Sequence, residues 1–201
     1  MAPTLRDLLL HSAAVRKHFE EKHFRSREKY RPDYRLLASS LLARLDFDSV
    51  FDVGCANGFL LESFHAAGKR IGGIELSPAA VAVLPEAIRP SVAIGDFGAT
   101  SGSWQLVCCV EVAEHIVPGR SGELVAVLAS AAERWIYFTA APPGQGGRGH
   151  LNCRPPEEWL ELFAEHGWTL DQPLTAGLRA DLEALSEAHW LRGNSLVLRR
   201  A

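Results

Sequence analysis

The chain has 201 residues, of which 47% are hydrophobic and 22% charged, and its formal net charge is -3. This length and composition are typical of a single globular domain with a full-sized core, and they exclude disordered and collagen-like classes. No stretch approaches the ~20 apolar residues that cross a bilayer, and the N-terminus carries no secretory leader pattern. We therefore expect one cytoplasmic domain over residues 1–201, with a helical cap over 1–45 and a core over 46–201.

The pattern of apolar residues predicts an α/β fold. Helical periodicity runs from Leu5 to about Phe24 and from Leu36 to Leu45, with a loop around residues 30–33. Strands are then expected at Ser49–Val53, Arg70–Leu76, Ser91–Ile94, Gln105–Val110, Trp135–Ala140, Trp168–Leu170 and Ser195–Leu198. Helices are expected between them, at 59–68, from Pro78 onward, and at Ser121–Glu133, Pro155–His166 and about Ala180–His189. This alternation predicts a doubly wound, mostly parallel seven-stranded sheet with helices on both faces and an N-terminal helical extension.

The four cysteines fit neither a zinc pair nor a disulfide framework. Cys108 and Cys109 are adjacent in an apolar run that is typical of a buried strand, where successive side chains point to opposite faces. Cys55 and Cys153 stand alone. We expect all four to be reduced thiols.

A glycine turn follows the first expected strand of the core, in the run Asp52-Val53-Gly54-Cys55-Ala56-Asn57-Gly58. Glycine there permits a positive φ and a close approach of ligand to backbone. A dinucleotide fingerprint fits poorly, because Ala56 and Phe59 stand where the second and third glycines belong, and no phosphate loop of the GxxxxGK[ST] type is present. A plain strand-to-helix turn remains an alternative at this point.

Two acidic residues follow the next two strands and strengthen the case for a ligand site. Glu75 ends the second strand, where a carboxylate can accept hydrogen bonds from both hydroxyls of a ribose. Asp96 follows the third strand in Gly95-Asp96-Phe97, although a turn cap is an alternative role for it. Ligands of doubly wound sheets bind at the carboxyl ends of the strands, which is where these residues fall.

The ordered set resembles the D/E-x-G-x-G-x-G motif and the later acidic positions of class I S-adenosylmethionine-dependent methyltransferases, with Ala56 in place of the middle glycine. The resemblance covers about residues 36–200. It implies an enzyme that binds S-adenosylmethionine, with an acid near Asp96 taking the adenine amino group and a neighbouring apolar side chain covering the ring. The cofactor-binding residues expected from it are Asp52, Gly54, Cys55, Ala56, Gly58, Glu75, Leu76, Asp96, Phe97 and Glu111.

An E-x-x-E-H stretch, Glu111 to His115, follows the fourth strand. Similar stretches occur in small-RNA ribose 2'-O-methyltransferases, where they hold a divalent metal, and in O-methyltransferases of ubiquinone biosynthesis. The resemblance therefore implies two alternatives: Glu111, Glu114, His115 and His150 bind Mg²⁺ or Mn²⁺, or His115 and His150 border the acceptor and act there as catalytic residues. A purely structural role for the stretch is a third.

The glycine-rich loop at 141–152, after the fifth strand, is expected to close over the acceptor, with His150 and Asn152 reaching it. The segment from Arg16 to Arg35 contains eight basic and four acidic residues, which gives it a net charge of about +4. This charge indicates either a solvated helix face or a lip that attracts an anionic acceptor.

The leading hypothesis is methyl transfer to a small-molecule acceptor, on an oxygen as the resemblance implies, with no membrane partner. The alternatives are an RNA ribose methyltransferase, which the acidic balance disfavours, and a catalytically idle cofactor-binding subunit. The acceptor and the oligomeric state are not predicted.

Overall fold

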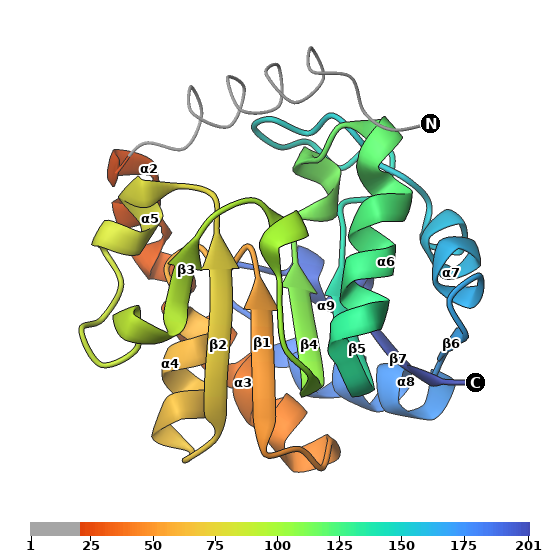
Figure 1. Cartoon of the computed structure of the whole chain (residues 1–201), viewed down its shortest axis with the longest axis horizontal. Coiled ribbons are helices and arrows are strands. Elements are labelled where there is room, and N and C mark those ends of the chain that lie inside the picture. Colours follow the sequence, from red (N-terminus) through yellow and green to blue (C-terminus); the bar gives the residue numbers. More distant parts are fainter. Residues whose placement is uncertain (1–20) are drawn as a thin grey trace.

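A computed structural model describes residues 21–201 of the chain (Figure 1). The helix expected from Leu5 lies outside the described residues except for its end, where α2 spans Glu21–Ser26. A 3₁₀ turn, η1 (Arg27–Tyr30), joins α2 to α3 (Arg31–Arg44). The boundaries of the cap and core domains stay a prediction.

Seven strands form one mixed sheet, as the sequence predicts. They are β1 (Ser49–Val53), β2 (Arg70–Glu75), β3 (Val92–Ile94), β4 (Trp104–Val110), β5 (Ala132–Thr139), β6 (Trp168–Leu170) and β7 (Leu196–Arg200). Their order is β3-β2-β1-β4-β5-β7-β6. The first five run parallel, and β7 pairs antiparallel with β5 and β6. The chain reverses direction across the sheet between β1 and β4, which is the switch point where doubly wound folds bind ligands.

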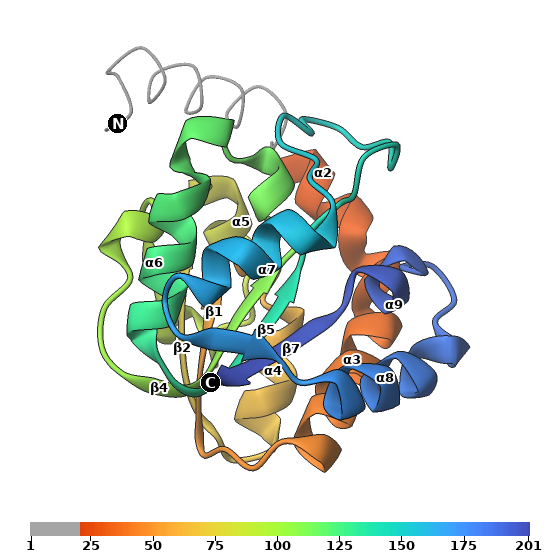
Figure 2. The same ribbon diagram turned by 90° about the vertical axis from the view of Figure 1, so that its right-hand side faces the viewer.

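Helices cover both faces of this sheet (Figures 1 and 2). One face packs against α6 (Ser121–Ala131) and α7 (Pro156–Ala164), and the other against α3, α4 (Phe59–Ala66), α8 (Gln172–Asp181) and α9 (Trp190–Asn194). The short α5 (Pro78–Ala82) lies beside α2 above the carboxyl ends of the strands. The doubly wound fold expected from the sequence is therefore confirmed.

The two layers of core explain why the strands are apolar throughout. Cys109 packs into the layer under α6 and α7, and Cys108 packs into the layer under α3 and α4. These adjacent residues therefore point to opposite faces, as expected, and all four cysteines are free thiols. Large side chains such as Trp159 and Phe64 are fully buried, one in each layer. Each such burial contributes about 1.5–3 kcal/mol to stability.

The last predicted helix, about Ala180–His189, is wrong. The helix in this region, α8, starts eight residues earlier at Gln172, because the Asp171 side chain caps it by accepting from the Leu174 amide. The helix that follows, α9, starts only at Trp190. Between them the backbone of residues 186–188 is held by hydrogen bonds to a side chain of α3 instead of by helical bonds.

Two other boundaries differ from the expectation. The loop expected around residues 30–33 is helical, because Pro32 lies in the first turn of α3, where it is well tolerated. Helix α6 ends at Ala131 instead of Glu133, since Ala132 already pairs with Trp104 of the neighbouring strand. Among the described residues, the longest apolar helices fall short of what a membrane span requires.

Candidate cofactor and acceptor site

A cleft opens at the carboxyl ends of β1, β2 and β4, beside the switch point of the sheet. Most of the residues predicted to bind a cofactor or acceptor line it, namely Asp52, Gly54, Cys55, Ala56, Glu75, Leu76, Asp96, Phe97, Glu111 and His115. Gly58, Glu114 and His150 do not line it. Ten of the predicted residues therefore lie together at this cleft and three lie outside its lining, and the roles assigned to them stay predictions.

The glycine turn after β1 has the backbone that the sequence indicated. Gly54 and Gly58 have φ values of 74° and 69°, which an L-residue rarely adopts. A Cβ on Gly54 would lie 2.5 Å from Val112 Cγ2, so glycine is also required for space. Ala56 adopts a φ of 44° although it replaces a glycine of the family motif. Gly58 stands at the N-cap of α4 and lies outside the cleft lining.

Glu75 holds this turn to the start of α5. Its Oε2 accepts from the Ala56 amide at 2.9 Å, and its Oε1 accepts from the Ser77 amide at 2.8 Å. Burial raises the pKa of Glu75 although these amides counter the effect. Burial, with the neighbouring Glu75 charge, raises the pKa of Asp52 to about 7. Two buried acids therefore face the cleft at a point where a positively charged ligand would stabilise the ionised form of both.

Asp96 and Phe97 form the wall of the cleft beyond β3. Asp96 also caps the 3₁₀ turn η3 (Phe97–Ala99) by accepting from the Gly98 amide, so the turn-cap role considered for it is present. Both of its oxygens accept from the guanidinium of Arg120, at 2.7 and 2.8 Å. The carboxylate is thus fixed in orientation at the edge of the cleft.

The segment before the core contributes residues that the motifs did not identify. Phe24 and Arg27, from α2 and η1, line the cleft opposite Glu75. The Phe24 carbonyl accepts from the buried Asn57 side chain at 2.8 Å, which ties α2 to the glycine turn. Arg27 Nη2 donates to the Tyr34 hydroxyl, while its buried Nε has no hydrogen-bond partner within residues 21–201. The local excess of basic residues was the only signal of this contribution in the sequence.

Two basic residues in the described part of the basic segment are paired with acids. Arg31 makes ion pairs with Glu28 and Glu62, and Lys29 pairs with Glu187. Arg31 is therefore already occupied by carboxylates of this chain, and Arg27 is the cation that lines the cleft among the residues of this segment that the structure describes.

Glu111 connects the cleft to the loop at 141–152 and to α9. Its backbone has a positive φ of 53°, and its carboxylate accepts from Gln145 Nε2 at 3.2 Å and from Asn194 Nδ2 at 3.0 Å. The same Asn194 amide donates to Gln145 Oε1. Glu111 is therefore bound to two amide side chains, one from the loop and one from the C-terminal helix.

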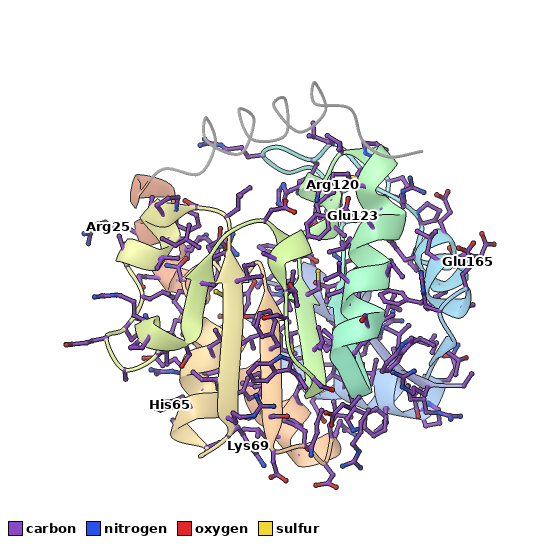
Figure 3. All side chains as sticks on the ribbon, in the orientation of Figure 1. Arg25, His65, Lys69, Arg120, Glu123 and Glu165 are labelled. Carbon is purple, nitrogen blue, oxygen red and sulfur yellow. The ribbon has the colours of Figure 1, made fainter. Side chains whose placement is uncertain are left out.

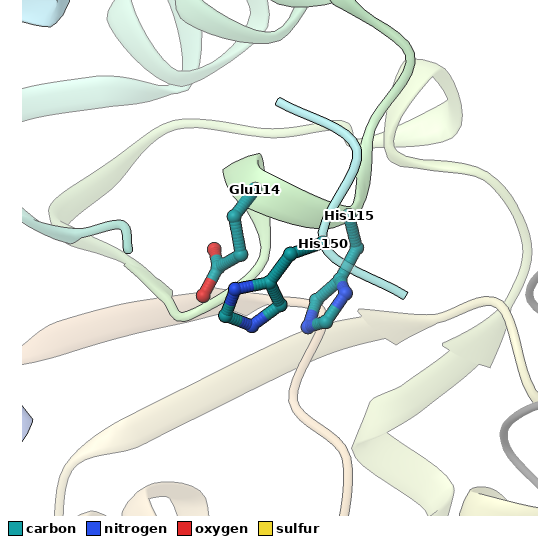
Figure 4. Close-up of side chains that lie close together, drawn as sticks. All are labelled: Glu114, His115 and His150. Atoms are coloured by element: carbon teal, nitrogen blue, oxygen red, sulfur yellow. The ribbon is translucent and has the colours of Figure 1, made fainter. Parts of the chain in front are cut away.

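Glu114, His115 and His150 lie together beside the cleft (Figure 4). Each offers a ligand atom within 4.8 Å of the others, so three of the four residues predicted to bind a metal converge. The His115 and His150 rings lie 5.1 Å apart, and their Nδ1 atoms face the carbonyls of Gly149 and Gln145, which fixes Nδ1 as the donor in each. Glu111, the fourth, lies outside this group.

Glu114 is an unusual member of this group because it is fully buried. Neither of its carboxyl oxygens has a hydrogen-bond partner within the described residues. Burial, followed by the charge of Glu111, raises the pKa of Glu114 to about 9. Its backbone carbonyl accepts from the amides of Leu151 and Asn152, which anchors the end of the loop at 141–152. Burial and the neighbouring charge therefore both favour the protonated form of this carboxyl.

The fold defines the class of protein to which this chain is similar. Over its whole length it superposes with a TM-score of 0.69 and 18% identity on all of the magnesium protoporphyrin IX methyltransferase of Synechocystis, solved with bound S-adenosylmethionine. An amino pentose methyltransferase from Micromonospora echinaspora gives a TM-score of 0.62 over 90% of this chain and 94% of its own, at 18% identity. The chain has the fold of class I S-adenosylmethionine-dependent methyltransferases, as its motifs indicated.

Curated relatives are methyltransferases as well. The ubiquinone biosynthesis O-methyltransferase of Burkholderia lata is 31% identical over 108 residues, which cover 48% of this chain and 46% of that protein. The chloroplastic magnesium protoporphyrin IX methyltransferase of Arabidopsis thaliana is 28% identical over 102 residues, 47% of this chain and 33% of its own. The match thus spans less than half of these relatives. No family model matches the chain.

Proposed function

We propose that this chain is an enzyme that transfers a methyl group from S-adenosylmethionine to an oxygen of a small-molecule acceptor. The observation that carries the proposal is the cleft at the switch point, where the glycine turn, Glu75 and the Asp96–Phe97 pair follow three successive strands. The fold and the curated relatives support the same activity. The comparisons give no support to an RNA acceptor or to an idle cofactor-binding role.

The cofactor contacts follow from the chemistry of the lining. Glu75 is assigned to the two ribose hydroxyls, because its oxygens each keep acceptor capacity beyond the one amide that they bind. Asp96 is assigned to the adenine amino group and Phe97 to the face of the ring. Arg27 is assigned to the carboxylate of the methionine portion, because its buried Nε has no partner in the described part of the chain. The acids Asp52 and Glu75 suit a ligand that carries positive charge.

The transfer is a displacement in which the acceptor oxygen bonds to the methyl carbon as the carbon–sulfur bond breaks, and the sulfur keeps the electron pair. The cofactor supplies a methyl group activated by its sulfonium charge, so the protein has to align the two reactants. His115 lines the cleft, and the ring of His150 lies edge-on to the ring of His115. We assign His115 to hold the acceptor hydroxyl and receive its proton, and His150 to position the His115 ring.

A divalent metal is the alternative role for this cluster. Glu114 and the two histidines give three donors, and in the structure Glu111 is bound by two amides instead. The pKa of Glu114 is raised by burial, so binding of a cation there would have to displace a proton that the buried site favours. The donor set therefore fits the positioning role better than a metal role.

The acceptor is proposed to be a small molecule, and its charge stays a prediction. Arg31 is held in ion pairs, and Arg27, which lines the cleft, is assigned to the cofactor carboxylate. Among the described residues, the lining therefore offers no second cation of this segment to an anionic acceptor.

The experiment that tests the function is transfer of a labelled methyl group from S-adenosylmethionine to pools of small molecules and of RNA. Label is expected in the small-molecule pool, and His115→Ala should abolish it while binding of S-adenosylhomocysteine persists. Label in RNA alone would favour the ribose alternative. Failure of the wild-type protein to bind either form of the cofactor by calorimetry would refute the proposal as a whole.

A further inference from the structure

Arg120 is a buried cation that the expected motifs do not include. It belongs to the 3₁₀ turn η5 (Pro118–Arg120), directly before α6, and its side chain is only 3% exposed (Figure 3). It does not line the cleft itself. Burial of a guanidinium is costly unless every donor is engaged, so its partners indicate what it is for.

Two of the partners of Arg120 are the residues of the cleft wall beyond β3, Asp96 and Phe97. Its Nη1 and Nη2 donate to Asp96 Oδ2 and Oδ1 at 2.8 and 2.7 Å, and its guanidinium carbon lies 4.1 Å from the centre of the Phe97 ring. On its other side, Nε and Nη2 donate to Glu123 at 2.8 and 2.7 Å. One side chain thus fixes both the plane of a carboxylate and the position of an aromatic ring.

We propose that Arg120 is a positioning residue for recognition of the adenine of the cofactor. The inference rests on the proposed function, in which Asp96 and Phe97 contact that base. A bidentate guanidinium–carboxylate pair is rigid and directional, so it prevents the Asp96 carboxylate from rotating away from the base. Stacking of the same guanidinium against Phe97 holds the ring that covers the adenine face.

Charge balance gives a second reason why this position requires a cation. The carboxylates of Asp96 and Glu123 both lie near Gly98, where a built Cβ would be 3.2 Å from Asp96 Oδ1 and 3.4 Å from Glu123 Oε1. Without Arg120 these like charges would repel each other at close range. Asp96 would then be pushed from its place at the cleft, although its cap on the Gly98 amide would remain.

Base selectivity tests the proposal, because a merely structural role would not change it. The probes are S-adenosylhomocysteine and its deaminated analogue S-inosylhomocysteine, in which a carbonyl replaces the amino group that Asp96 would accept from. Wild-type protein should bind the adenine form at least about tenfold more tightly, since the carbonyl would face a fixed carboxylate. Arg120→Met should bring the ratio of the two dissociation constants to within about threefold of unity, as should Asp96→Asn.

Matched variants separate this effect from loss of stability. Arg179→Met removes another partly buried arginine, which bonds the Ser195 carbonyl away from the cleft, and it should leave the ratio unchanged. Arg120→Lys keeps the charge but loses the bidentate geometry, so its ratio should be intermediate. This variant also serves if Arg120→Met does not fold.

The outcomes distinguish the inference from the function on which it rests. A wild-type ratio retained in Arg120→Met or Arg120→Lys would overturn the positioning role. A wild-type protein that binds both probes equally would remove Asp96 from adenine recognition, and the inference with it, while methyl transfer could still stand. A wild-type protein that binds neither would refute the proposed function.

Discussion

Glu75 is occupied by the amides of Ala56 and Ser77 before a ligand binds, so it shapes the cleft as well as facing it. Glu75→Gln replaces one acceptor oxygen with an amide donor that opposes a backbone N–H. Because charge-assisted bonds to ribose hydroxyls are worth about 1.5–3 kcal/mol each, we expect affinity for S-adenosylhomocysteine to fall at least about tenfold. Calorimetry measures the affinity, and a thermal melt checks the fold. Unchanged affinity in a folded variant would contradict the ribose assignment.

Asp52 makes the stability of the protein depend on pH. Its pKa is raised to about 7 by burial and then by Glu75, whereas an unfolded aspartate has a pKa of about 3.9. Between these values the native state holds a proton that the unfolded state has lost. The contribution of Asp52 to stability is therefore fully present below about pH 4 and falls as pH rises to 7, by up to about 4 kcal/mol.

Asp52→Asn should remove this dependence. The variant should unfold at higher urea than the wild type at pH 8, with the difference disappearing towards pH 4. Ligand binding should respond in the opposite sense, because the cationic cofactor favours the ionised acid: wild-type affinity should rise between pH 6 and 8. If the urea midpoints of variant and wild type changed in parallel across this pH range, Asp52 would be ionised throughout.

At the scale of single residues, the sequence indicates cleft residues that lie at the ends of strands. Asp52 and Glu75 lie at the carboxyl ends of β1 and β2, and Asp96 follows β3, so their spacing indicates their place in a parallel sheet. Arg120 comes from a turn before α6, and it contacts Asp96 24 positions away. No local sequence pattern marks Arg120, and for Arg27 the sequence offers only the local excess of basic residues.

Among the elements, Asp33 joins α3 to the connection between α8 and α9. It is buried in α3, and its carboxylate accepts from the amides of Ser186, Glu187 and Ala188 at 2.6–2.9 Å. Asp33→Ala would leave these amides unpaired, so we expect the free energy of unfolding to fall by about 3 kcal/mol. Asp181→Ala, which breaks the half-exposed pair with Arg44, is the control and should cost less than about 1 kcal/mol.

The same contact predicts how acid destabilises the chain. Burial would raise the pKa of Asp33, but the three amides and the Ser186 hydroxyl outweigh it and hold the pKa below its usual value. The stabilisation is therefore present above about pH 4 and is lost as pH falls through the native pKa. In urea titrations, the difference in the free energy of unfolding between wild type and Asp33→Ala should become smaller below pH 4. A difference that stays constant with pH would show that the amides do not depend on the charge of the carboxylate.

The loop at 141–152 and its cluster predict the response to metal chelation. Because burial favours the protonated form of Glu114 and Glu111 is bound by Gln145 and Asn194, we expect methyl transfer to be unaffected by a chelator and by added Mg²⁺ or Mn²⁺. Once an acceptor is known, turnover with and without chelator measures this. Loss of activity that Mg²⁺ restores would assign Glu114, His115 and His150 to a metal instead.

Elements were predicted well where local sequence decides them. The apolar strands and the Ser77 cap before α5 follow from residues within a few positions of one another. The stretch near residues 182–189 has helix-forming residues, yet Asp33, more than 150 positions away, takes its amides. A tertiary contact of this kind overrides local propensity, and the sequence does not reveal it.

Across the whole molecule, the cleft collects residues from α2, the glycine turn and the ends of β2 and β4. A ligand bound there would tie these segments together, in addition to contacts such as the Asn57 bond to the Phe24 carbonyl. Ligand that binds only the native state stabilises it by about 2.7 kcal/mol at 100 times its dissociation constant. For a chain of this size that corresponds to a rise of about 5–10 °C in the melting temperature.

We therefore expect S-adenosylhomocysteine to raise the melting temperature by this amount and to slow hydrogen exchange in α2 together with the glycine turn. Glu75→Gln at the same ligand concentration should show about half the shift, because tenfold weaker binding leaves about 1.4 kcal/mol. Asn57→Ala should keep most of the thermal shift but lose part of the protection of α2, since it removes the bond between that helix and the turn. Protection confined to the turn, with α2 exchanging as fast as without ligand, would show that the N-terminal segment takes no part in holding the cofactor.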